Sequence, residues 1–169
     1  MTMQPDRPPD GPPDGRPRRS DAELLARFQA KGPLAGASRL LGLTVTGIDQ
    51  ANHRIEASFL ATAELCNPIG TVQGGILTAM LDELMSISAM VAGNFAIVVP
   101  TLEIKTSYIR AVKPGSLSGW GRVVRMGRNV VFLEGALHDA EGQLVATSTA
   151  TAAVMPRPAR PAPRKMAAD

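Results

Sequence analysis

The chain has few cysteine and aromatic residues. Of its 169 residues only one, Cys66, is a cysteine, and 4% are aromatic. One cysteine cannot form an internal disulfide or a cysteine cluster for a metal ion, so we expect neither. No long apolar segment opens the chain. This predicts that it has no secretory signal and makes the cytoplasm the default location.

The central part of the chain has no excess of one charge, although the pI is about 9.5. Residues 1–19 and 156–169 together hold eight of the 18 basic residues, four of the 15 acidic residues and ten of the 14 prolines. Residues 20–155 keep ten basic and eleven acidic residues, so we expect no basic face for nucleic acid. We predict two disordered tails, 1–19 and 156–169, around one domain, 20–155.

The most informative stretch is Asn67–Ala92. It opens with turn-forming residues, and from Ile76 to Ala92 it contains no proline or glycine, which predicts a helix of about 25 Å. Apolar residues cover almost the whole circumference of this helix, so it should be buried. Asp82 and Glu83 lie near its middle, where a charge is most costly in lipid, so we expect no membrane span.

The few polar groups of this stretch suggest a site. Thr78, Asp82 and Ser86 follow one another at intervals of four, on one stripe of the helix. A carboxylate there is costly unless it is hydrogen-bonded or faces a wet cleft. The N–H groups around Gly74 and Gly75 are unsatisfied donors of a helix N-terminus and favour a negative oxygen. The stretch therefore predicts an oxyanion pocket with a carboxylate about two turns along.

The other segments read as a short helix and several strands. Ser20–Glu23 has the S-x-x-E pattern of a helix capping box, and Pro100 predicts an edge or a bulge. Alternating patterns predict strands at Leu41–Asp49, Arg54–Leu60, Ile97–Arg110, Leu117–Met126, Val130–His138 and Gln143–Met155. The order predicts an α+β fold: a hairpin, the buried helix and a four-strand meander, forming one long curved antiparallel sheet around one apolar helix.

The quoted residues resemble a known family. Asn67-x-x-Gly70-x-x-Gln73-Gly74-Gly75, with Asp82 nine positions after Gln73, is similar to the PaaI-type hotdog-fold thioesterases of the 4-hydroxybenzoyl-CoA thioesterase superfamily. The resemblance spans roughly residues 34–155 and continues through Thr101–Tyr108, Lys113–Gly115, Arg125–Arg128 and Asp139–Gly142. The family's usual histidine before the two glycines is Gln73 here, so any role of that imidazole must be argued again for an amide.

The resemblance implies hydrolysis of a small or medium acyl- or aryl-CoA thioester, with coenzyme A as part of the substrate and no separate cofactor. It also implies a homodimer or homotetramer with the active site between subunits. The carbonyl would accept a hydrogen bond from Gly74, and the partner subunit's Asp82 would act as general base or nucleophile. Asn67 and Gln73 would orient the carbonyl or the water, and Thr101 would hold the water.

The same resemblance assigns substrate binding to five further residues. They are Gly75, Thr78, Lys113, Arg125 and Arg128, of which the three cations are candidates for the nucleotide phosphates. Structural interpretations stay open beside these roles. Asp82 could be a core carboxylate bonded to Thr78 and Ser86, the glycines could serve tight packing, and Asn67 could be a turn residue. Glu83 is expected in a structural ion pair, and is otherwise the alternative base.

Two other functions are compatible with the sequence. A non-catalytic module that binds acyl-CoA would explain the loss of the usual histidine, although the presence of Asp82 argues against it. A hotdog hydratase would share the fold and ligand, but it usually carries an Asp–His or His–Glu pair, which we do not find. The acyl group, the choice between coenzyme A and acyl carrier protein, and attack by water or by Asp82 itself stay open.

Overall fold

The protein is described by a computed structural model that covers residues 19–30 and 36–158. Most of the two tails predicted to be disordered lies outside these residues. The helices and strands are α1 Asp21–Ala30, α2 Ala37–Leu40, β1 Thr44–Asp49, β2 Arg54–Ala61, a 3₁₀ turn at Ala63–Leu65, α3 Gly74–Ala92, β3 Ile97–Val98, β4 Thr101–Tyr108, β5 Gly115–Met126, β6 Val130–His138, β7 Leu144–Ala153 and β8 Met155–Pro156.

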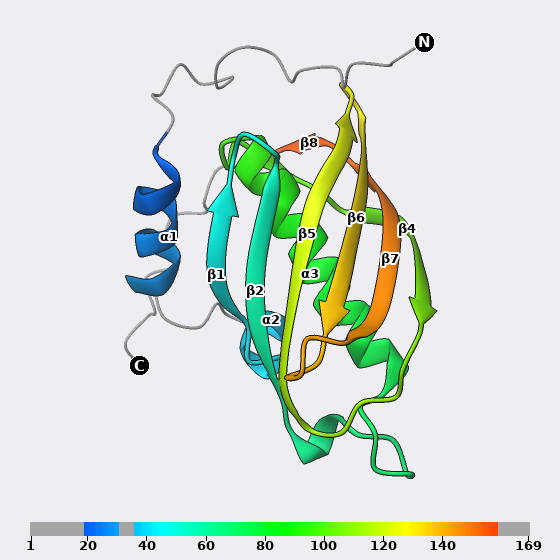
Figure 1. The fold of residues 1–169 in the computed structure, drawn as a ribbon. Coiled ribbons are helices and arrows are strands. Elements are labelled where there is room, and N and C mark those ends of the chain that lie inside the picture. The colour runs from blue at the N-terminus through cyan, green and yellow to red at the C-terminus, as the bar shows by residue number, and fades with distance from the viewer. Residues whose placement is uncertain (1–18, 31–35, 159–169) are drawn as a thin grey trace, which may run out of the picture.

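Six strands form one antiparallel sheet in the order β1-β2-β5-β6-β7-β4 (Figure 1). The predicted long antiparallel sheet is confirmed, but the predicted four-strand meander is wrong. Of the four strands that follow α3 in this sheet, only β5, β6 and β7 pair in chain order, while β4 pairs with β7 at the far edge and β5 pairs with β2. In the chain, α3 lies between β2 and β4, and it crosses one face of the sheet (Figure 1). The segment after α3 therefore joins the sheet as β4, at the edge opposite β1.

The core is the helix α3 held against one face of this sheet. It begins at Gly74, two residues before the predicted start. Met80, Leu81, Leu84 and Met85 are fully buried, as the all-round apolar pattern predicts. Gly121 of β5 lets the helix approach closely, because a Cβ there would lie 2.4 Å from the backbone carbon of Leu84. α3 is long and apolar enough to cross a membrane by composition, but its place inside the sheet identifies it as a core helix.

Strand β4 differs from the single strand predicted for Ile97–Arg110. Pro100 separates a two-residue strand, β3, from β4, as a residue without an N–H donor can interrupt a ladder. A bulge follows at once: Thr101 pairs with Ala152 while Glu103 pairs with Thr151, so Leu102 is an extra residue. A regular strand would place Leu102 on the same face as Ile104, but Leu102 is 64% exposed.

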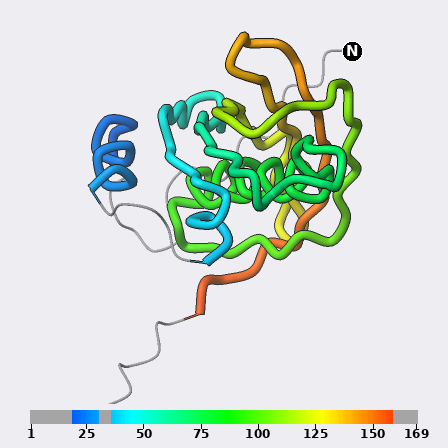
Figure 2. Tube along the Cα trace, turned by 90° about the horizontal axis from the view of Figure 1, so that it is seen from below, coloured from blue at the N-terminus to red at the C-terminus, as the bar shows by residue number. Residues whose placement is uncertain are grey.

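The peripheral elements also refine the predictions. The capping box at Ser20 is confirmed, because its hydroxyl accepts from the Glu23 N–H while the Glu23 carboxylate accepts from the Ser20 N–H. α1 stands beside the body formed by the sheet and α3 (Figures 1 and 2). The predicted strand start at Leu41 is wrong, since β1 begins at Thr44 and Leu41 is the C-cap of the one-turn helix α2. Beside the predicted domain end at 155, β8 pairs with β3 and the Arg157 N–H donates to the Ala96 carbonyl.

Candidate active site

Asp82 lies half-buried in the middle of α3, and its partner is a hydroxyl of β4. Thr101 Oγ1 donates to Asp82 Oδ1 over 2.6 Å. The structural alternative, a carboxylate bonded to Thr78 and Ser86, does not occur, because Thr78 instead bonds to hydroxyls of β4. One carboxylate oxygen is thus held by Thr101, and Oδ2 accepts no hydrogen bond from a described residue.

The bulge at Leu102 is what turns Thr101 toward Asp82. Thr106 points at the helix too, since its hydroxyl accepts from Thr78 Oγ1 over 3.1 Å. Thr101 and Thr106 are five positions apart, and in a regular strand an odd spacing places side chains on opposite faces. The extra residue in the bulge restores the same face. The chain therefore uses a local irregularity to bring a hydroxyl to the carboxylate.

The start of α3 presents free backbone donors. Gln73 is the N-cap residue, and its carbonyl accepts from the Ile76 and Leu77 N–H groups. The N–H groups of Gly74 and Gly75 precede the first intrahelical bond and have no acceptor within the helix. A Cβ on Gly75 would meet nothing within 4 Å. Packing against protein therefore does not explain that glycine, and the space beside it is open to a ligand.

Gln73 itself is exposed, and its side chain forms no cap to the helix. Its backbone is fixed instead, because the Gln73 N–H donates to Leu65 and the preceding Val72 N–H donates to Val112. These two bonds dock the loop in front of α3 against neighbouring loops. Gln73 is thereby fixed at the N-cap of α3, where its exposed side-chain amide can bind a ligand.

Asn67, for which both a catalytic and a turn role were open, makes the contacts of a turn residue. Asn67 Oδ1 accepts from the backbone N–H groups of Ile69 and Thr71, and Nδ2 donates to Thr71 Oγ1 over 2.8 Å. Both sides of the amide thus shape the loop in front of α3. This arrangement assigns Asn67 to holding that loop.

Tyr108 is the residue that the sequence analysis did not single out. Its hydroxyl lies 2.7 Å from Thr78 Oγ1, and a Cβ on Gly74 would lie 3.2 Å from its ring carbon Cζ. The tyrosine thus covers the first turn of α3. In the sequence, Tyr108 alternates with Ile104 and Thr106, which predicts that all three side chains lie on the same face of β4. This alternation does not predict that the Tyr108 ring covers the start of α3.

Glu83 faces away from this arrangement, toward α2. Ser38 Oγ donates to Glu83 Oε2 over 3.0 Å, so among the residues that the structure describes its partner is a hydroxyl and the predicted ion pair is not seen. Burial raises the pKa of the Glu83 carboxyl above its ordinary value, the Ser38 bond opposes this, and the Asp82 charge adds to it. Ser38 belongs to the short helix that the sequence analysis missed.

The cations proposed for phosphate binding lie at opposite ends of β5. Lys113 is exposed in the loop beside the start of α3, next to Val112. Arg125 and Arg128 are exposed at the other end, about 36 Å away along the strand. One chain therefore does not bring the three cations together around one nucleotide.

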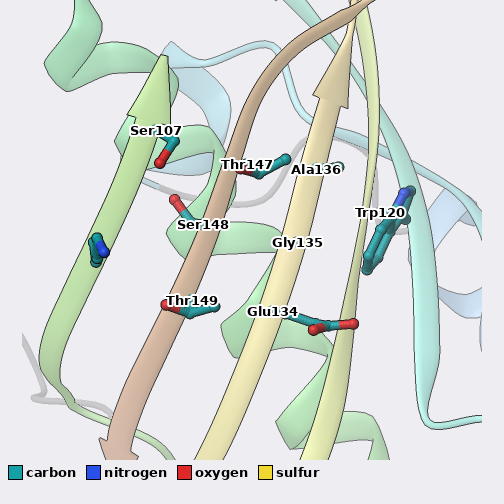
Figure 3. A pocket seen from close by; sticks show the side chains of 9 residues that line it. Ser107, Trp120, Glu134, Gly135, Ala136, Thr147, Ser148 and Thr149 are labelled. Atoms are coloured by element: carbon teal, nitrogen blue, oxygen red, sulfur yellow. The ribbon is translucent and has the colours of Figure 1, made fainter. Parts of the chain in front are cut away.

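A hollow on the outer face of the sheet is separate from these residues. It is lined by Lys105, Trp120, Glu134, Thr147 and Thr149, among others (Figure 3). These side chains alternate with residues that face α3, so the hollow lies on the far side of the sheet from Asp82. No group of three or more His, Cys, Asp or Glu residues in 19–30 and 36–158 could hold a metal ion.

Comparisons with known proteins agree with this geometry. Residues 69–146 match the Thioesterase superfamily. The proofreading thioesterase EntH of Cronobacter turicensis is 28% identical over 115 residues, which cover 68% of this chain and 82% of EntH.

Solved structures give the same result. A phenylacetic acid degradation-related protein from Ralstonia eutropha is 34% identical, with a TM-score of 0.71 over 77% of this chain and 98% of that one. A protein from Streptococcus mutans, solved bound to acetyl-CoA, shares the fold at 19% identity, with a TM-score of 0.62 over 68% of this chain and 90% of that one.

A long antiparallel sheet curved around one buried helix defines a hotdog fold, and the carboxylate in that helix and the free N–H groups at its start are groups that acyl transfer can use. The chain belongs to the thioesterase superfamily, as a PaaI-type hotdog thioesterase, and is a thioester hydrolase.

Proposed function

We propose that this thioesterase hydrolyses a small or medium acyl- or aryl-CoA to the free acid and coenzyme A, with Asp82 as the catalytic carboxylate. Family membership supports thioester hydrolysis, and the acetyl-CoA complex of the Streptococcus mutans neighbour supports coenzyme A as the thiol. The observation that carries the assignment of Asp82 is its 2.6 Å bond from Thr101, which holds one oxygen and leaves the other for chemistry.

The start of α3 supplies the electrophilic half of the site. The Gly74 N–H, supported by the helix dipole, points to where the thioester carbonyl oxygen would lie. As the carbonyl is attacked, its oxygen becomes negative, and one preorganised donor there contributes about 10²–10³ in rate. Gly75 leaves room for the carbonyl carbon, and Gln73 can orient the carbonyl or the water.

The carboxylate supplies the nucleophilic half. Thr101 has one hydroxyl proton and gives it to Asp82 Oδ1, so toward water it can only accept a hydrogen bond. A water molecule that donates to Thr101 Oγ1 and to Asp82 Oδ2 is held with its lone pairs outward. Asp82 takes one proton of this water as its oxygen adds to the carbonyl, and collapse of the intermediate expels the thiolate of coenzyme A. The thiolate then takes up a proton.

These two halves cannot come from the same chain. Gly74 and Asp82 are eight positions apart, about 12 Å along the helix axis. A general base must lie within about 2.6–3.2 Å of the proton that it takes, or one water further away. We therefore propose a homodimer, or a homotetramer built from two such dimers, in which the start of α3 in one protomer faces the partner subunit's Asp82.

The test is release of free thiol from a panel of acyl-CoAs that runs from short aliphatic to phenylacetyl and benzoyl chains. We expect release by the wild type, and a kcat at least about 10² lower in Asp82→Asn, whose amide oxygen can still accept from Thr101. Glu83→Gln is the matched control, because it removes the neighbouring carboxylate and should leave kcat unchanged.

Two results would contradict the proposal in different ways. Full activity in Asp82→Asn with loss in Glu83→Gln would move the base to Glu83. No thiol release from any ester of the panel, with acyl-CoA still bound, would leave a binding module instead of an enzyme.

A further inference from the structure

Four hydroxyl groups form a chain that ends beside the proposed oxyanion site. Ser148 Oγ lies 2.7 Å from Thr106 Oγ1, Thr78 Oγ1 lies 3.1 Å from Thr106 Oγ1, and Tyr108 Oη lies 2.7 Å from Thr78 Oγ1. Ser148 is 3% exposed whereas Tyr108 is 53% exposed. The chain therefore runs from the core to the surface at the start of α3, and neither the family match nor the mechanism above gives it a role.

The number of protons fixes the direction of its outer link. A hydroxyl carries one proton and two acceptor lone pairs. Thr78 donates its proton to Thr106, so it has none left for Tyr108. The proton of the 2.7 Å contact between Tyr108 and Thr78 must therefore come from Tyr108. With its own proton committed, the phenol oxygen can act toward a ligand only as an acceptor.

This acceptor stands next to the free N–H of Gly74. A Cβ on Gly74 would lie 3.4 Å from Tyr108 Oη, so the phenol oxygen flanks the first residue of the helix. A thioester carbonyl that accepts from the Gly74 N–H would thus have a hydrogen-bond acceptor at its side. The pair offers a donor for the carbonyl and an acceptor for a neighbouring N–H or O–H group.

We propose that Tyr108 accepts a hydrogen bond from an N–H or O–H of the substrate that lies close to the thioester, and thereby selects substrates that carry one. This inference rests on the proposed function. In every coenzyme A thioester the first amide N–H of the pantetheine arm follows the sulfur after two methylene groups, so all such substrates offer this donor. A hydroxyl on the acyl group is the other source.

The test compares two thiol arms on one acyl group, the most active of the panel. The first substrate is its N-acetylcysteamine thioester, which keeps the amide N–H. The second is its thioester with 2-mercaptoethyl acetate, in which an ester oxygen replaces that N–H. Tyr108→Phe keeps the ring against Gly74 and removes only the oxygen. Loss of the acceptor leaves an unpaired amide, so kcat/KM should fall about tenfold for the first substrate and less than about twofold for the second.

A third substrate distinguishes the two sources of the donor. It carries a hydroxyl on the acyl group and the ester thiol arm. Loss confined to this substrate would support the proposal with the acyl hydroxyl as donor. An equal loss on all three substrates would show a merely structural role of Tyr108 and overturn the proposal, as would no loss on any of them.

A second variant tests the proton count. Thr106→Val removes the acceptor of the Thr78 proton, so Thr78 can donate to Tyr108 and free the phenol to donate. The ratio of kcat/KM for the amide substrate to kcat/KM for the ester substrate should then fall, although Tyr108 itself is unchanged. An unchanged preference would contradict the proposed direction of the chain.

Binding separates this inference from the proposed function. Ketone analogues of the two thioesters, with CH₂ in place of sulfur, cannot be hydrolysed. If the wild type hydrolyses no thioester, the proposed function fails, but calorimetry with these ketones still decides the role of Tyr108. Weaker binding of the amide ketone alone to Tyr108→Phe supports the acceptor role with the amide as donor. Equal binding of both ketones, and of a third ketone that carries the acyl hydroxyl, to both proteins refutes the acceptor role.

Discussion

Thr101 shows how much a single hydroxyl contributes at this site. It fixes the orientation of the Asp82 carboxylate and, because its proton is used in doing so, it can hold a water molecule only as an acceptor. Valine has the same shape but neither function. The bond that Thr101 makes is charge-assisted, and such bonds contribute more than neutral ones.

We expect Thr101→Val to lower kcat about tenfold or more, as a hydrogen bond to a charged group contributes about 1.5–3 kcal/mol. Thr101→Ser keeps the hydroxyl and should retain most of the activity. Steady-state kinetics on the best acyl-CoA measures both. Equal kcat values for the valine and serine variants would remove Thr101 from the mechanism.

Replacing Glu83 should change the stability of the protein and not its catalytic rate. Burial raises its pKa in the folded protein, so in the window between the unfolded and the folded pKa the folded state binds more protons. Stability therefore falls as the pH rises through that window. Glu83→Gln keeps an acceptor for Ser38 and removes the charge. Its melting temperature should exceed that of the wild type at pH 7.5, and the difference should disappear below about pH 4, near the pKa of an unfolded glutamate.

Thermal unfolding at the two pH values measures this difference. A Glu83→Gln protein that is less stable than the wild type at pH 7.5 would mean that the ionised carboxylate is well compensated in the fold. The Ser38 bond would then outweigh the effect of burial.

At the scale of elements, Gly121 and Gly75 are glycines for different structural reasons. Gly121 permits the contact between β5 and α3, whereas a Cβ added at Gly75 would meet none of the described residues within 4 Å. We expect Gly121→Ala to lower stability by about 1–3 kcal/mol or more through overpacking against backbone. Gly75→Ala should be neutral or stabilising by up to about 1 kcal/mol, because alanine favours helix, yet it should lower kcat/KM.

Urea unfolding and steady-state kinetics on both variants check this pair. The glycines at the start of α3 would be packing residues, as the structural interpretation holds, if Gly75→Ala lost stability and kept its activity. The opposite pattern assigns Gly75 to the ligand.

The sequence predicted the elements better than their connections. The apolar helix, the capping box and most strands follow from local periodicity and were confirmed. Periodicity describes one face of one segment, so it did not show that β4 pairs with β7 or that Leu102 is an extra residue. The resemblance predicted that Thr101 holds the water, but its hydrogen bond to Asp82 depends on the bulge at Leu102, which no local pattern shows. Tyr108 was missed because its position depends on how β4 crosses the start of α3.

At the scale of the whole molecule, Lys113 and Arg128 lie at opposite ends of β5, so substituting each one tests a different place for the nucleotide phosphates. Both are exposed, but only Lys113 lies near the start of α3. If either contacts the nucleotide phosphates, its alanine variant should raise KM about three- to tenfold for acyl-CoA with little change in kcat. The N-acetylcysteamine thioester, which has no phosphate, is the control substrate and should show no change.

An unchanged KM for acyl-CoA in one of these variants removes that residue from the nucleotide site. A change in KM for both substrates would instead indicate a disturbed fold. If both alanine variants affect only acyl-CoA, two protomers contribute to one nucleotide site, because β5 separates the two cations by about 36 Å.

A shared site also predicts complementation between inactive proteins. Asp82→Asn lacks the carboxylate, and Gly75→Val obstructs the start of α3. A mixed dimer of the two has one site with both features intact, so random mixing should restore about a quarter of the wild-type activity. Thiol release after co-refolding measures it. Activity no higher than that of the separate variants would place both halves in one chain.

The 12 Å between Gly74 and Asp82 has a consequence for how the enzyme responds to its own abundance. If two chains must meet to complete one site, the isolated chain is folded but inert. Below the dissociation constant of the dimer, the total rate would fall with the square of the protein concentration and not in proportion to it. Dilution alone would then switch off hydrolysis, without any inhibitor, and a saturating substrate that bridges the two chains would switch it on again.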